Sequence, residues 1–376
     1  MGLFYKRDTT IITDLANWPG IEANNGEALT VAHTECLGDC MPAEWHPQRA
    51  VQITWPDENT DWQPRLDEAV KCYLRIAYEI ATTQPLIITC SHADSLNTLL
   101  RERLPQKAID NIIVSQCEIN DTWVRDYGFI TVMENGKYKL CDFRFNGWGN
   151  KFCAESDNAV NRHLFQNKLM TGSYDDCLDF VFEGGSIESD GRGTLLTTSH
   201  CLLNPNRNPS LSKGDITHRL LRELKSQRIL WLDHGYLCGD DTDSHIDTLA
   251  RLCPNDTIAY VKCSDPDDEH YEELSLMEQQ LKSFQTTSDL PYRLVALPMG
   301  PKLYDEEGMR LPTTYANYLV INHKRILMPT YGDPETDQAA AKALERAFPD
   351  YSVTGIDCRI LVWQHGSLHC STMQYY

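Results

Sequence analysis

Residues 315–356 read YANYLVINHKRILMPTYGDPETDQAAAKALERAFPDYSVTGI and contain the clearest unit of regular structure in the chain. Two runs rich in strand-forming residues, Tyr315–Ile321 and Arg325–Thr330, flank a short turn and predict a hairpin. Apolar residues three and four positions apart predict a helix over Asp337–Phe348. Tyr351–Ile356 predicts a closing strand. This stretch therefore predicts one ββαβ unit.

The same order of elements recurs along the chain. The predicted ranges are strands Gly128–Met133, Lys137–Phe145 and Leu178–Phe182 with helix Ser156–Leu169; strands Gly193–Thr198 and Arg228–Leu232 with helix Ser212–Ser226; strands Ile246–Cys253, Thr257–Cys263 and Tyr292–Leu297 with helix Asp268–Ser283; and, less regularly, strands Ala50–Trp55, Leu86–Thr89 and Ile112–Cys117 with helices Leu66–Ala81 and Asp94–Leu104. Repeats that are too small to bury their own faces usually stack or close into a ring. We expect a ring with helices outside and strands radiating from a central axis; a mixed α/β sheet is the alternative.

The charge balance disfavours two classes of partner. Among 376 residues, 54 acidic side chains outnumber 34 basic ones, and the formal net charge is −20. Such a surface repels phosphate backbones and anionic lipids, so we expect no nucleic acid and no membrane as partners. It attracts cations, although acidic residues also serve simply to keep a protein soluble.

The sequence predicts a reduced, cytoplasmic protein. Residues 1–25 lack the apolar core of a secretory signal, and no stretch has the roughly 18 apolar residues that cross a bilayer. The fourteen cysteines are scattered without a CxxC pair, and many, such as Cys90, lie in apolar runs where a thiol packs as a small hydrophobe.

Polar residues gather at the junctions between the predicted units. The junction segments are Asn120–Gly128, Glu183–Gly185, Gly239–Asp247 and Gly366–Cys370. In a ring of repeats, equivalent junctions converge at one end of the axis. Four distant segments can then supply one site that contains a cysteine, a histidine and several carboxylates.

Each of these residues also has a purely structural interpretation. One cysteine among fourteen is usually structural, His245 with Asp247 is a common surface pairing, and Trp123 is more often packing than a ligand contact. Glu183 before two glycines is compatible with a polar turn. Because these residues occur at equivalent junctions of the repeats, a shared site is favoured over a separate structural role for each residue.

The sequence predicts neither a metal site nor a cofactor. The usual Cys and His spacings of zinc sites are missing. Asp240, Asp241 and Asp243 are similar to the start of a calcium loop, but His245 and Thr248 stand where an EF-hand does not allow them. A phosphate-binding loop is also not predicted, because Gly184-Gly185-Ser186 lacks the GK[ST] ending.

At these motifs the sequence resembles the family of agmatine deiminases and bacterial peptidylarginine deiminases, within the guanidine-modifying (pentein) superfamily. The similarity runs in order from about residue 41 to the C-terminus. The matching segments are Met41–Trp45, Trp55-Pro56, Trp123–Asp126, Phe145–Gly149, Glu183–Ile187, Asn206–Pro209, Thr242–Asp247 and His369-Cys370.

The resemblance implies a five-bladed α/β propeller (pentein) with pseudo-fivefold symmetry, which agrees with the repeats. It implies that Cys370 is the nucleophile and His245 the acid/base. Asp126 and Asp247 match the guanidinium-binding carboxylates, and Glu183 matches the acidic residue that supports the histidine. We expect one catalytic domain over residues 1–376, with residues 1–40 packed on it as an extension, and the family's habit suggests a homo-oligomer.

The expected reaction needs no cofactor. The Cys370 thiolate attacks the guanidinium carbon, His245 protonates the departing ammonia, and water then releases a ureido product from an amidino-thioether. With agmatine as the substrate, the products are N-carbamoylputrescine and ammonia, within putrescine biosynthesis. A deiminase of arginine, peptidyl arginine or another guanidine, and a non-catalytic pentein-fold binding protein, remain alternatives.

Two local features bear on the substrate. Asp241 is a candidate partner for the ammonium of agmatine, and Trp123 is a candidate contact for its methylene chain. Alternatively, an arginine near the motifs could hold a substrate carboxylate or form structural ion pairs; these arginines are Arg125, Arg144 and Arg207. Two departures from the family pattern, Ser244 and Gln364–Ser367, concern the pocket wall.

Side-chain alternation gives two expectations for the site. On an extended strand, His245 and Asp247 would point to one face. By the same rule, His369 and Cys370 would point to opposite faces, so His369 is expected to be a packing or orienting residue instead of the base.

Overall fold

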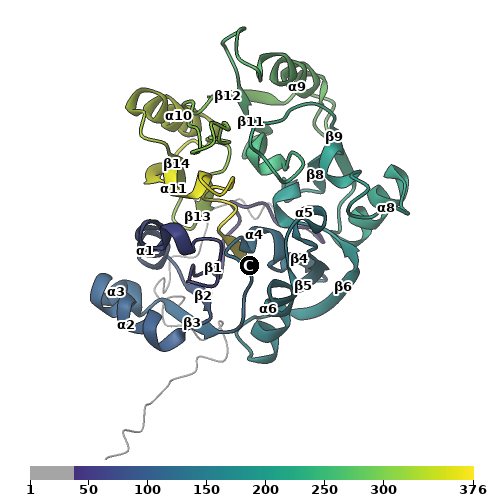
Figure 1. The fold of residues 1–376 in the computed structure, drawn as a ribbon. Helices are drawn as coiled ribbons and strands as arrows, with labels where there is room; N and C mark the ends of the chain where they lie inside the picture. Colours follow the sequence, from purple (N-terminus) through teal and green to yellow (C-terminus); the bar gives the residue numbers. More distant parts are fainter. Residues whose placement is uncertain (1–37) are drawn as a thin grey trace, which may run out of the picture.

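Five small sheets surround a common centre in the computed structural model, which describes residues 38–376 (Figure 1). In each sheet one antiparallel pair is followed by a parallel pair. The longer helices lie at the periphery, and the C-terminal segment reaches the middle (Figure 1). The predicted ring of repeated α/β units is confirmed.

The second to fifth sheets each contain three strands and one long peripheral helix. Their elements are β4 (Ile130–Glu134), β5 (Lys137–Arg144), β6 (Ser173–Val181) and α6 (Glu155–Gln166); β7 (Ile187–Ser189), β8 (Thr194–Thr198), β9 (Arg228–Leu232) and α8 (Lys213–Glu223); β10 (Ala250–Cys253), β11 (Thr257–Lys262), β12 (Arg293–Pro298) and α9 (Tyr271–Ser283); and β13 (Leu319–Ile321), β14 (Arg325–Thr330), β15 (Ser352–Asp357) and α10 (Pro334–Ala347).

The first sheet joins both ends of the described chain. It contains β1 (Ala50–Thr54), β2 (Leu86–Cys90) and β3 (Ile112–Gln116), with α1 (Leu66–Ala81), α2 (Ala93–Arg103) and α3 (Gln106–Ile109). The strand β16 (Met373–Tyr375) pairs antiparallel with β1 and completes this sheet. Strand β16 therefore closes the ring directly after Cys370, which fixes the end of the chain at the centre. Neither β16 nor β7 was predicted, because each is only three residues long.

Short helical turns lie between the longer elements of the chain. They are α4 (Val124–Tyr127), α5 (Gly147–Asn150), α7 (Ser199–Leu202), α11 (Arg359–Val362) and the 3-10 turns η2 (Gln63–Arg65), η3 (Gly184–Ser186) and η4 (Ile246–Thr248). Two predicted strands consequently start too early: β10 begins at Ala250 instead of Ile246, and β13 begins at Leu319 instead of Tyr315. The residues in front of both strands turn toward the axis and carry polar side chains of the site.

The structure bears on two further predictions, that the cysteines are reduced and that no segment crosses a membrane. Twelve described cysteines are free, most of them buried. Cys40 is disulfide-bonded, so the prediction of fully reduced cysteines is wrong at this position. Between residues 38 and 376, no helix is long and apolar enough to cross a membrane. The predicted packing of residues 1–40 falls mostly outside the described residues, and the single domain stays a prediction.

Candidate active site

A cavity of about 370 Å³ opens at the centre of the ring and has Cys370 among its lining residues. The lining is strongly acidic and aromatic: Asp61, Asp121, Trp123, Asp126, Trp148, Phe152, Asp240, Asp241, Thr242, Thr248, Trp363, Gln364, His365, Gly366 and Cys370. Among these described residues there is neither lysine nor arginine. Of the predicted site residues, Cys370, Asp126, Trp123 and Asp241 line the cavity directly, so three of the four predicted junction segments meet there. The fourth, Glu183–Gly185, is outside the lining but contacts Asp126 and His245.

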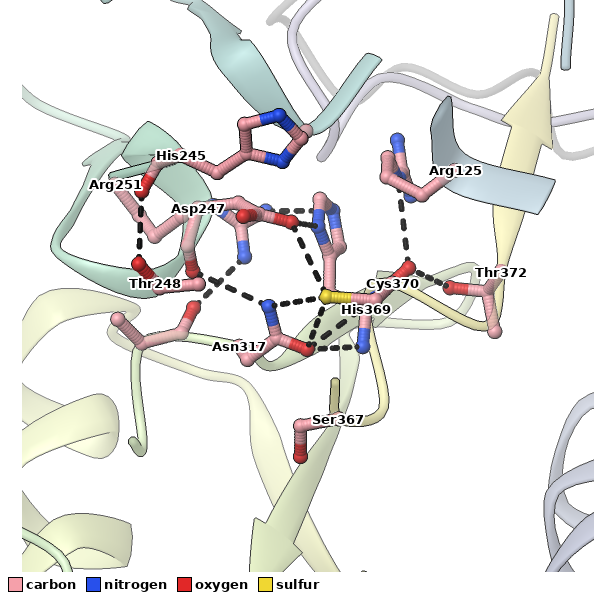
Figure 2. Close-up of polar contacts among 12 residues, drawn as sticks. Arg125, His245, Asp247, Thr248, Arg251, Asn317, Ser367, His369, Cys370 and Thr372 are labelled. Carbon is pink, nitrogen blue, oxygen red and sulfur yellow. Dashed lines mark hydrogen bonds and ion pairs between the residues drawn. The ribbon is translucent and has the colours of Figure 1, made fainter. Parts of the chain in front are cut away.

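The Cys370 thiol lies between an amide and a carboxylate. The Asn317 side-chain N–H donates to Sγ at 3.2 Å, and Oδ2 of Asp247 lies 3.9 Å from Sγ (Figure 2). Burial, together with the charges of Asp247 and Asp126, raises the pKa of Cys370 well above its ordinary value, and the Asn317 bond opposes this shift. The thiol is therefore not ionised by its surroundings alone.

His245 is fully buried and held by acidic groups on both sides. Its Nε2 lies 3.2 Å from Oε2 of Glu183, and its Nδ1 lies 3.7 Å from Oδ1 of Asp126. Burial acts to lower the pKa of His245, but Asp126, the adjacent Cys201 and Glu183 raise it well above the ordinary value. This histidine is suited to donate a proton to a leaving group.

Glu183 is held in place by Arg207. The guanidinium Nε lies 2.7 Å from Oε2 of Glu183, and the side chains of both residues have no exposed surface. Although burial acts to raise the pKa of Glu183, His245 and Arg207 keep it below its ordinary value. Arg207 also bonds Oδ2 of Asp243 at 2.7 Å. Of the two alternatives for Arg207, a substrate-carboxylate partner or a structural ion pair, the structure shows the ion pairs with Glu183 and Asp243.

Asp126 lies in the short helical turn α4 and accepts two hydrogen bonds. The indole N–H of Trp148 donates to Oδ2 at 2.9 Å, and the backbone N–H of Gly185 donates to Oδ1 at 2.8 Å. Burial raises the pKa of Asp126 to about 6; the neighbouring His245 lowers it, and the carboxylates Asp247 and Glu183 raise it. A bound cation would favour the ionised form.

Asp247 has one fixed oxygen and one open oxygen. Its Oδ2 lies 2.8 Å from Nδ1 of His369, whereas its buried Oδ1 has no hydrogen-bond partner among the described residues. Burial acts to raise the pKa of Asp247, but His369, His245 and Arg251 lower it. A buried carboxylate oxygen without a partner, on a residue whose other oxygen lies 3.9 Å from the thiol, is an acceptor suited to a guanidinium N–H.

Glycines allow the close approach of these groups. A Cβ on Gly185 would lie 2.6 Å from Nδ1 of His245 and 2.8 Å from Oδ1 of Asp126. A Cβ on Gly366 would lie 2.2 Å from the Trp123 ring. Ser244, which departs from the family pattern, has a φ of 66°, a backbone conformation that favours glycine. The usual glycine before the histidine thus matches a backbone requirement of this turn.

Neither residue pair lies in the extended strand that the alternation rule assumes, although the residues still meet. His245 precedes the turn η4 instead of lying in a strand. His369 and Cys370 lie in a turn before β16, and both approach Oδ2 of Asp247, at 2.8 and 3.9 Å. The expectation of opposite directions is therefore wrong. The expectation that His369 orients a neighbour agrees with its bond to Asp247.

Sequence reasoning missed several residues of the site. Asn317 lies in an apolar run that was interpreted as strand, and a lone amide in such a run was the available signal. Trp148 and Glu44 stood in the quoted motifs without a role. Arg251, a fully buried guanidinium, gave no signal, because nothing in the sequence distinguishes a buried arginine in a strand from an exposed one.

Metal-ligating side chains also meet near the site, in two groups: Glu183, Cys201 and His245, and Glu44, Glu188 and His369. In the first group, Arg207 already bonds Glu183. In the second group, Arg251 bonds both glutamates. A metal ion would have to compete with these guanidinium groups for the same oxygens.

Comparisons with known proteins agree with this geometry. The model of the Porphyromonas-type peptidyl-arginine deiminase family matches residues 40–375. The agmatine deiminase of Pseudomonas aeruginosa (strain LESB58) is 31% identical over 357 residues, covering 89% of this chain and 94% of that protein.

Two solved structures share the fold over nearly the whole described chain. A Porphyromonas gingivalis protein assigned provisionally as an arginine deiminase is 47% identical, with a TM-score of 0.84 over 90% of this chain and 98% of that chain. A cysteine-to-serine variant of the C. jejuni agmatine deiminase with substrate bound is 39% identical, with a TM-score of 0.83 over 90% and 96%. The five sheets and these similarities confirm the predicted pentein fold.

Proposed function

The chain belongs to the Porphyromonas-type peptidyl-arginine deiminase family, and we propose that it is an agmatine deiminase. It hydrolyses the guanidinium of agmatine to N-carbamoylputrescine and ammonia, as a hydrolase of C–N bonds. The acidic cavity that contains Cys370 carries this conclusion: its lining has five aspartates and, among the described residues, no basic side chain except His365.

The charge of the cavity distinguishes agmatine from arginine. Agmatine ends in an ammonium, whereas arginine ends in an ammonium and a carboxylate, which needs a basic partner. Asp61, Asp121, Asp240 and Asp241 line the cavity, and burial, with help from Asp240, raises the pKa of Asp241. A bound ammonium favours the ionised form of such a carboxyl group. Binding of the ammonium end of agmatine and ionisation of the carboxyl group therefore favour each other.

The arginines that could hold a carboxylate lie elsewhere. The backbone N–H of Arg125 donates to the carbonyl of Cys370, and its buried guanidinium donates to the carbonyl of His369. Arg207 bonds Glu183 and Asp243, and Arg144 is exposed outside the cavity. Free arginine stays the second candidate because the 47% identical Porphyromonas gingivalis protein is provisionally assigned to it.

Catalysis begins when the guanidinium is held in front of Cys370. Asp126 and Asp247 accept its N–H groups, and the open Oδ1 of Asp247 provides an acceptor without a competing donor. The thiolate forms a C–S bond with the guanidinium carbon as the C–N bond breaks. Imidazolium His245 gives its proton to the departing nitrogen, which leaves as ammonia.

The second half-reaction restores the enzyme. Neutral His245 takes a proton from water, and the hydroxide attacks the carbon of the amidino-thioether. The C–S bond breaks, the hydroxyl proton of the intermediate returns the departing sulfur to the thiol, and the carbon becomes the carbonyl of the ureido product. Glu183 stabilises His245 whenever this histidine is protonated, because an oxygen of Glu183 lies 3.2 Å from Nε2.

The substrate itself ionises the nucleophile. The carboxylates and burial raise the pKa of Cys370, but a cation about 4 Å away contributes roughly 4 kcal/mol at an effective dielectric near 20. That energy corresponds to a pKa decrease on the order of three. The thiol proton leaves to solvent before attack, and the empty enzyme keeps a protonated, unreactive thiol.

Several wider expectations belong to the same proposal. The partner is a small cationic guanidine, and the product assigns the enzyme to putrescine biosynthesis. A homo-oligomer in the cytoplasm is the expected state of the protein. The acidic surface makes nucleic acid and anionic membranes poor partners.

The test is ammonia release from four guanidines: agmatine, 1-butylguanidine, arginine and an arginine peptide blocked at both ends. We expect the highest kcat/KM for agmatine, a lower value for 1-butylguanidine, which lacks the ammonium, and far lower values for the other two. Cys370→Ser should bind agmatine and release no ammonia. Preference for arginine would overturn the assigned substrate, and full activity of the variant would overturn the nucleophile.

A further inference from the structure

Behind the cavity, a buried chain of charged groups connects Glu44 to the substrate carboxylate Asp247. Nε2 of His369 lies 2.7 Å from Oε2 of Glu44, and Nδ1 of the same ring lies 2.8 Å from Oδ2 of Asp247. Asp247 in turn reaches the Cys370 sulfur at 3.9 Å. The His369 ring therefore joins two carboxylates that are 203 positions apart in the chain, as both residue numbers show.

Glu44 is itself fixed on every side. Its Oε1 accepts the backbone N–H of Val320 at 2.7 Å, and its Oε2 accepts Nη2 of Arg251 at 2.6 Å. Burial acts to raise the pKa of Glu44, but the charges of Arg251 and His369 hold it well below its usual range. Glu44 is thus an anchored, ionised group and not a surface carboxylate that happens to touch a histidine.

Arg251 has no further capacity to neutralise this cluster. Its Nε bonds Glu188 at 2.5 Å, and its Nη1 donates to the carbonyls of Ala316 and Tyr318. One guanidinium therefore faces two glutamates, and Asp247 adds a third carboxylate nearby. Each ring nitrogen of His369 lies within hydrogen-bond distance of a carboxylate oxygen, Nδ1 of Asp247 and Nε2 of Glu44. Arg251 Nη2 lies 3.0 Å from Nε2 of His369, so these two nitrogens converge on one oxygen of Glu44.

The contact between His369 and Asp247 determines which carboxylate oxygen of Asp247 is available to a guanidinium. Oδ2 is occupied by His369, and the buried Oδ1 has no partner among the described residues. If the His369 ring turned, Oδ2 would lose its donor and the carboxylate could rotate away from the guanidinium position. The ring in turn cannot turn while Glu44 holds Nε2.

We propose that Glu44 is a positioning residue of this enzyme: through His369 it holds Asp247 in the orientation that binds the guanidinium. The inference rests on the proposed role of Asp247 in substrate binding and goes beyond it, because Glu44 lies outside the set of cavity-lining residues. Figure 2 shows the His369 ring and the Cys370 sulfur both in contact with the carboxylate of Asp247.

The first test measures agmatine affinity by calorimetry in the Cys370→Ser background, and kcat and KM in otherwise unchanged enzyme. Glu44→Gln removes the charge but keeps the shape. His369→Asn keeps a donor near the Nδ1 position and loses the link to Glu44, whereas His369→Leu loses both contacts. We expect about tenfold weaker binding and higher KM for the first two variants, with a smaller change in kcat, and a larger loss for His369→Leu.

Glu188→Gln is the matched control. Glu188 is as buried as Glu44 and bonds the same Arg251, but it makes no hydrogen bond to His369 among the described residues. It should lower thermal stability by a similar amount and leave agmatine affinity near the wild-type value. Equal affinity losses in Glu188→Gln and Glu44→Gln would overturn the proposal, because they would indicate a general effect of core charge.

A double-mutant cycle tests whether Glu44 acts through His369. The variant with both Glu44→Gln and His369→Asn should bind agmatine no more weakly than His369→Asn alone. If the losses of agmatine binding free energy in the two single variants add up in the double variant, the proposal that Glu44 acts through His369 is overturned.

Nuclear magnetic resonance of ¹⁵N-histidine-labelled protein gives a readout independent of turnover. Because Nε2 of His369 faces Glu44 and Nδ1 faces Asp247, Glu44→Gln should shift the Nε2 signal more than the Nδ1 signal. Ring signals of His369 that do not respond to Glu44→Gln would overturn the inference. If the wild type releases no ammonia from any guanidine, the proposed function fails, while these signals still decide whether Glu44 orients His369.

Discussion

The side-chain amide of Asn317 donates a hydrogen bond to Sγ of Cys370, with 3.2 Å between nitrogen and sulfur. The amide orientation is fixed, because its oxygen accepts the backbone N–H groups of His369 and Cys370 at 2.8 and 3.2 Å. Burial and two aspartates raise the pKa of this thiol, and hydrogen bonds from the Ser367 backbone and the Asn317 side chain lower it. The proposed nucleophile is therefore stabilised by neutral donors and, in our account, by the cationic substrate.

Replacing Asn317 should make Cys370 harder to ionise. A hydrogen bond to a charged group is worth about 1.5–3 kcal/mol, and 1.36 kcal/mol corresponds to one pKa unit. In Asn317→Ala we expect alkylation by iodoacetamide at neutral pH to slow by about tenfold or more. Asn161→Ala removes another buried amide, which bonds Tyr127 and Asp142, and serves as the control. An unchanged pH profile of alkylation in Asn317→Ala would contradict this role.

A cationic alkylating agent should react faster than a neutral one. The carboxylates of Asp126 and Asp247 attract an amidinium, and its charge lowers the pKa of Cys370. At neutral pH, 2-chloroacetamidine should therefore label Cys370 much faster than iodoacetamide, after correction for their intrinsic rates with a free thiol. Mass spectrometry of the labelled peptide identifies the site. Equal corrected rates would show that the substrate charge does not assist ionisation.

Gly185 should not tolerate even one methyl group. A Cβ at this position would lie 2.6 Å from Nδ1 of His245 and 2.8 Å from Oδ1 of Asp126, so both side chains would have to move. Because small displacements of reacting groups are costly, we expect Gly185→Ala to lower kcat/KM by about a hundredfold. Gly214→Ala, in helix α8, where a Cβ would make only an ordinary contact 3.6 Å from Oγ of Ser212, should keep full activity and raise stability slightly. Circular dichroism checks that both variants fold.

The acid limb of the pH profile should report Asp126. Its pKa is raised to about 6, and only the ionised form accepts guanidinium N–H groups, so kcat/KM should fall as the pH drops through this value. The Trp148 N–H lowers the pKa of Asp126. Trp148→Phe removes that donor, so the acid limb should move to higher pH. As a control, Trp62→Phe loses a different buried N–H, which bonds Thr122, and should leave the acid limb in place. An acid limb that does not move in Trp148→Phe would rule out its assignment to Asp126.

Most of the fold followed from sequence, because each unit repeats one pattern of strand and helix signals. Strand β9 was predicted with its exact bounds, Arg228–Leu232, and helix α1 with Leu66–Ala81. The strands that close the ring could not be predicted in this way. Strand β16 is three residues long and acquires its identity from pairing with β1, more than 300 positions earlier.

The sequence predicted those site residues that combine a reactive or charged side chain with a position at a junction between two repeats. Cys370 and Asp126 line one cavity, and His245, Glu183 and Asp247 lie against it. Side-chain direction was not predictable, because the turn η4 replaces a strand and changes which residues share a face. Asn317 and Arg251 were missed for a related reason: their roles come from contacts with residues on other sheets, and a single strand pattern carries no trace of those contacts.

The central claim is that Cys370 attacks the guanidinium carbon of agmatine, and an acid-quenched reaction tests it most directly. Wild-type enzyme mixed with agmatine, quenched within milliseconds, digested and examined by mass spectrometry should carry an amidino adduct on Cys370. Neither Cys370→Ser nor wild type mixed with putrescine should carry it. Ammonia release from agmatine with no adduct on Cys370, or with the adduct on Cys201 beside His245, would contradict the account.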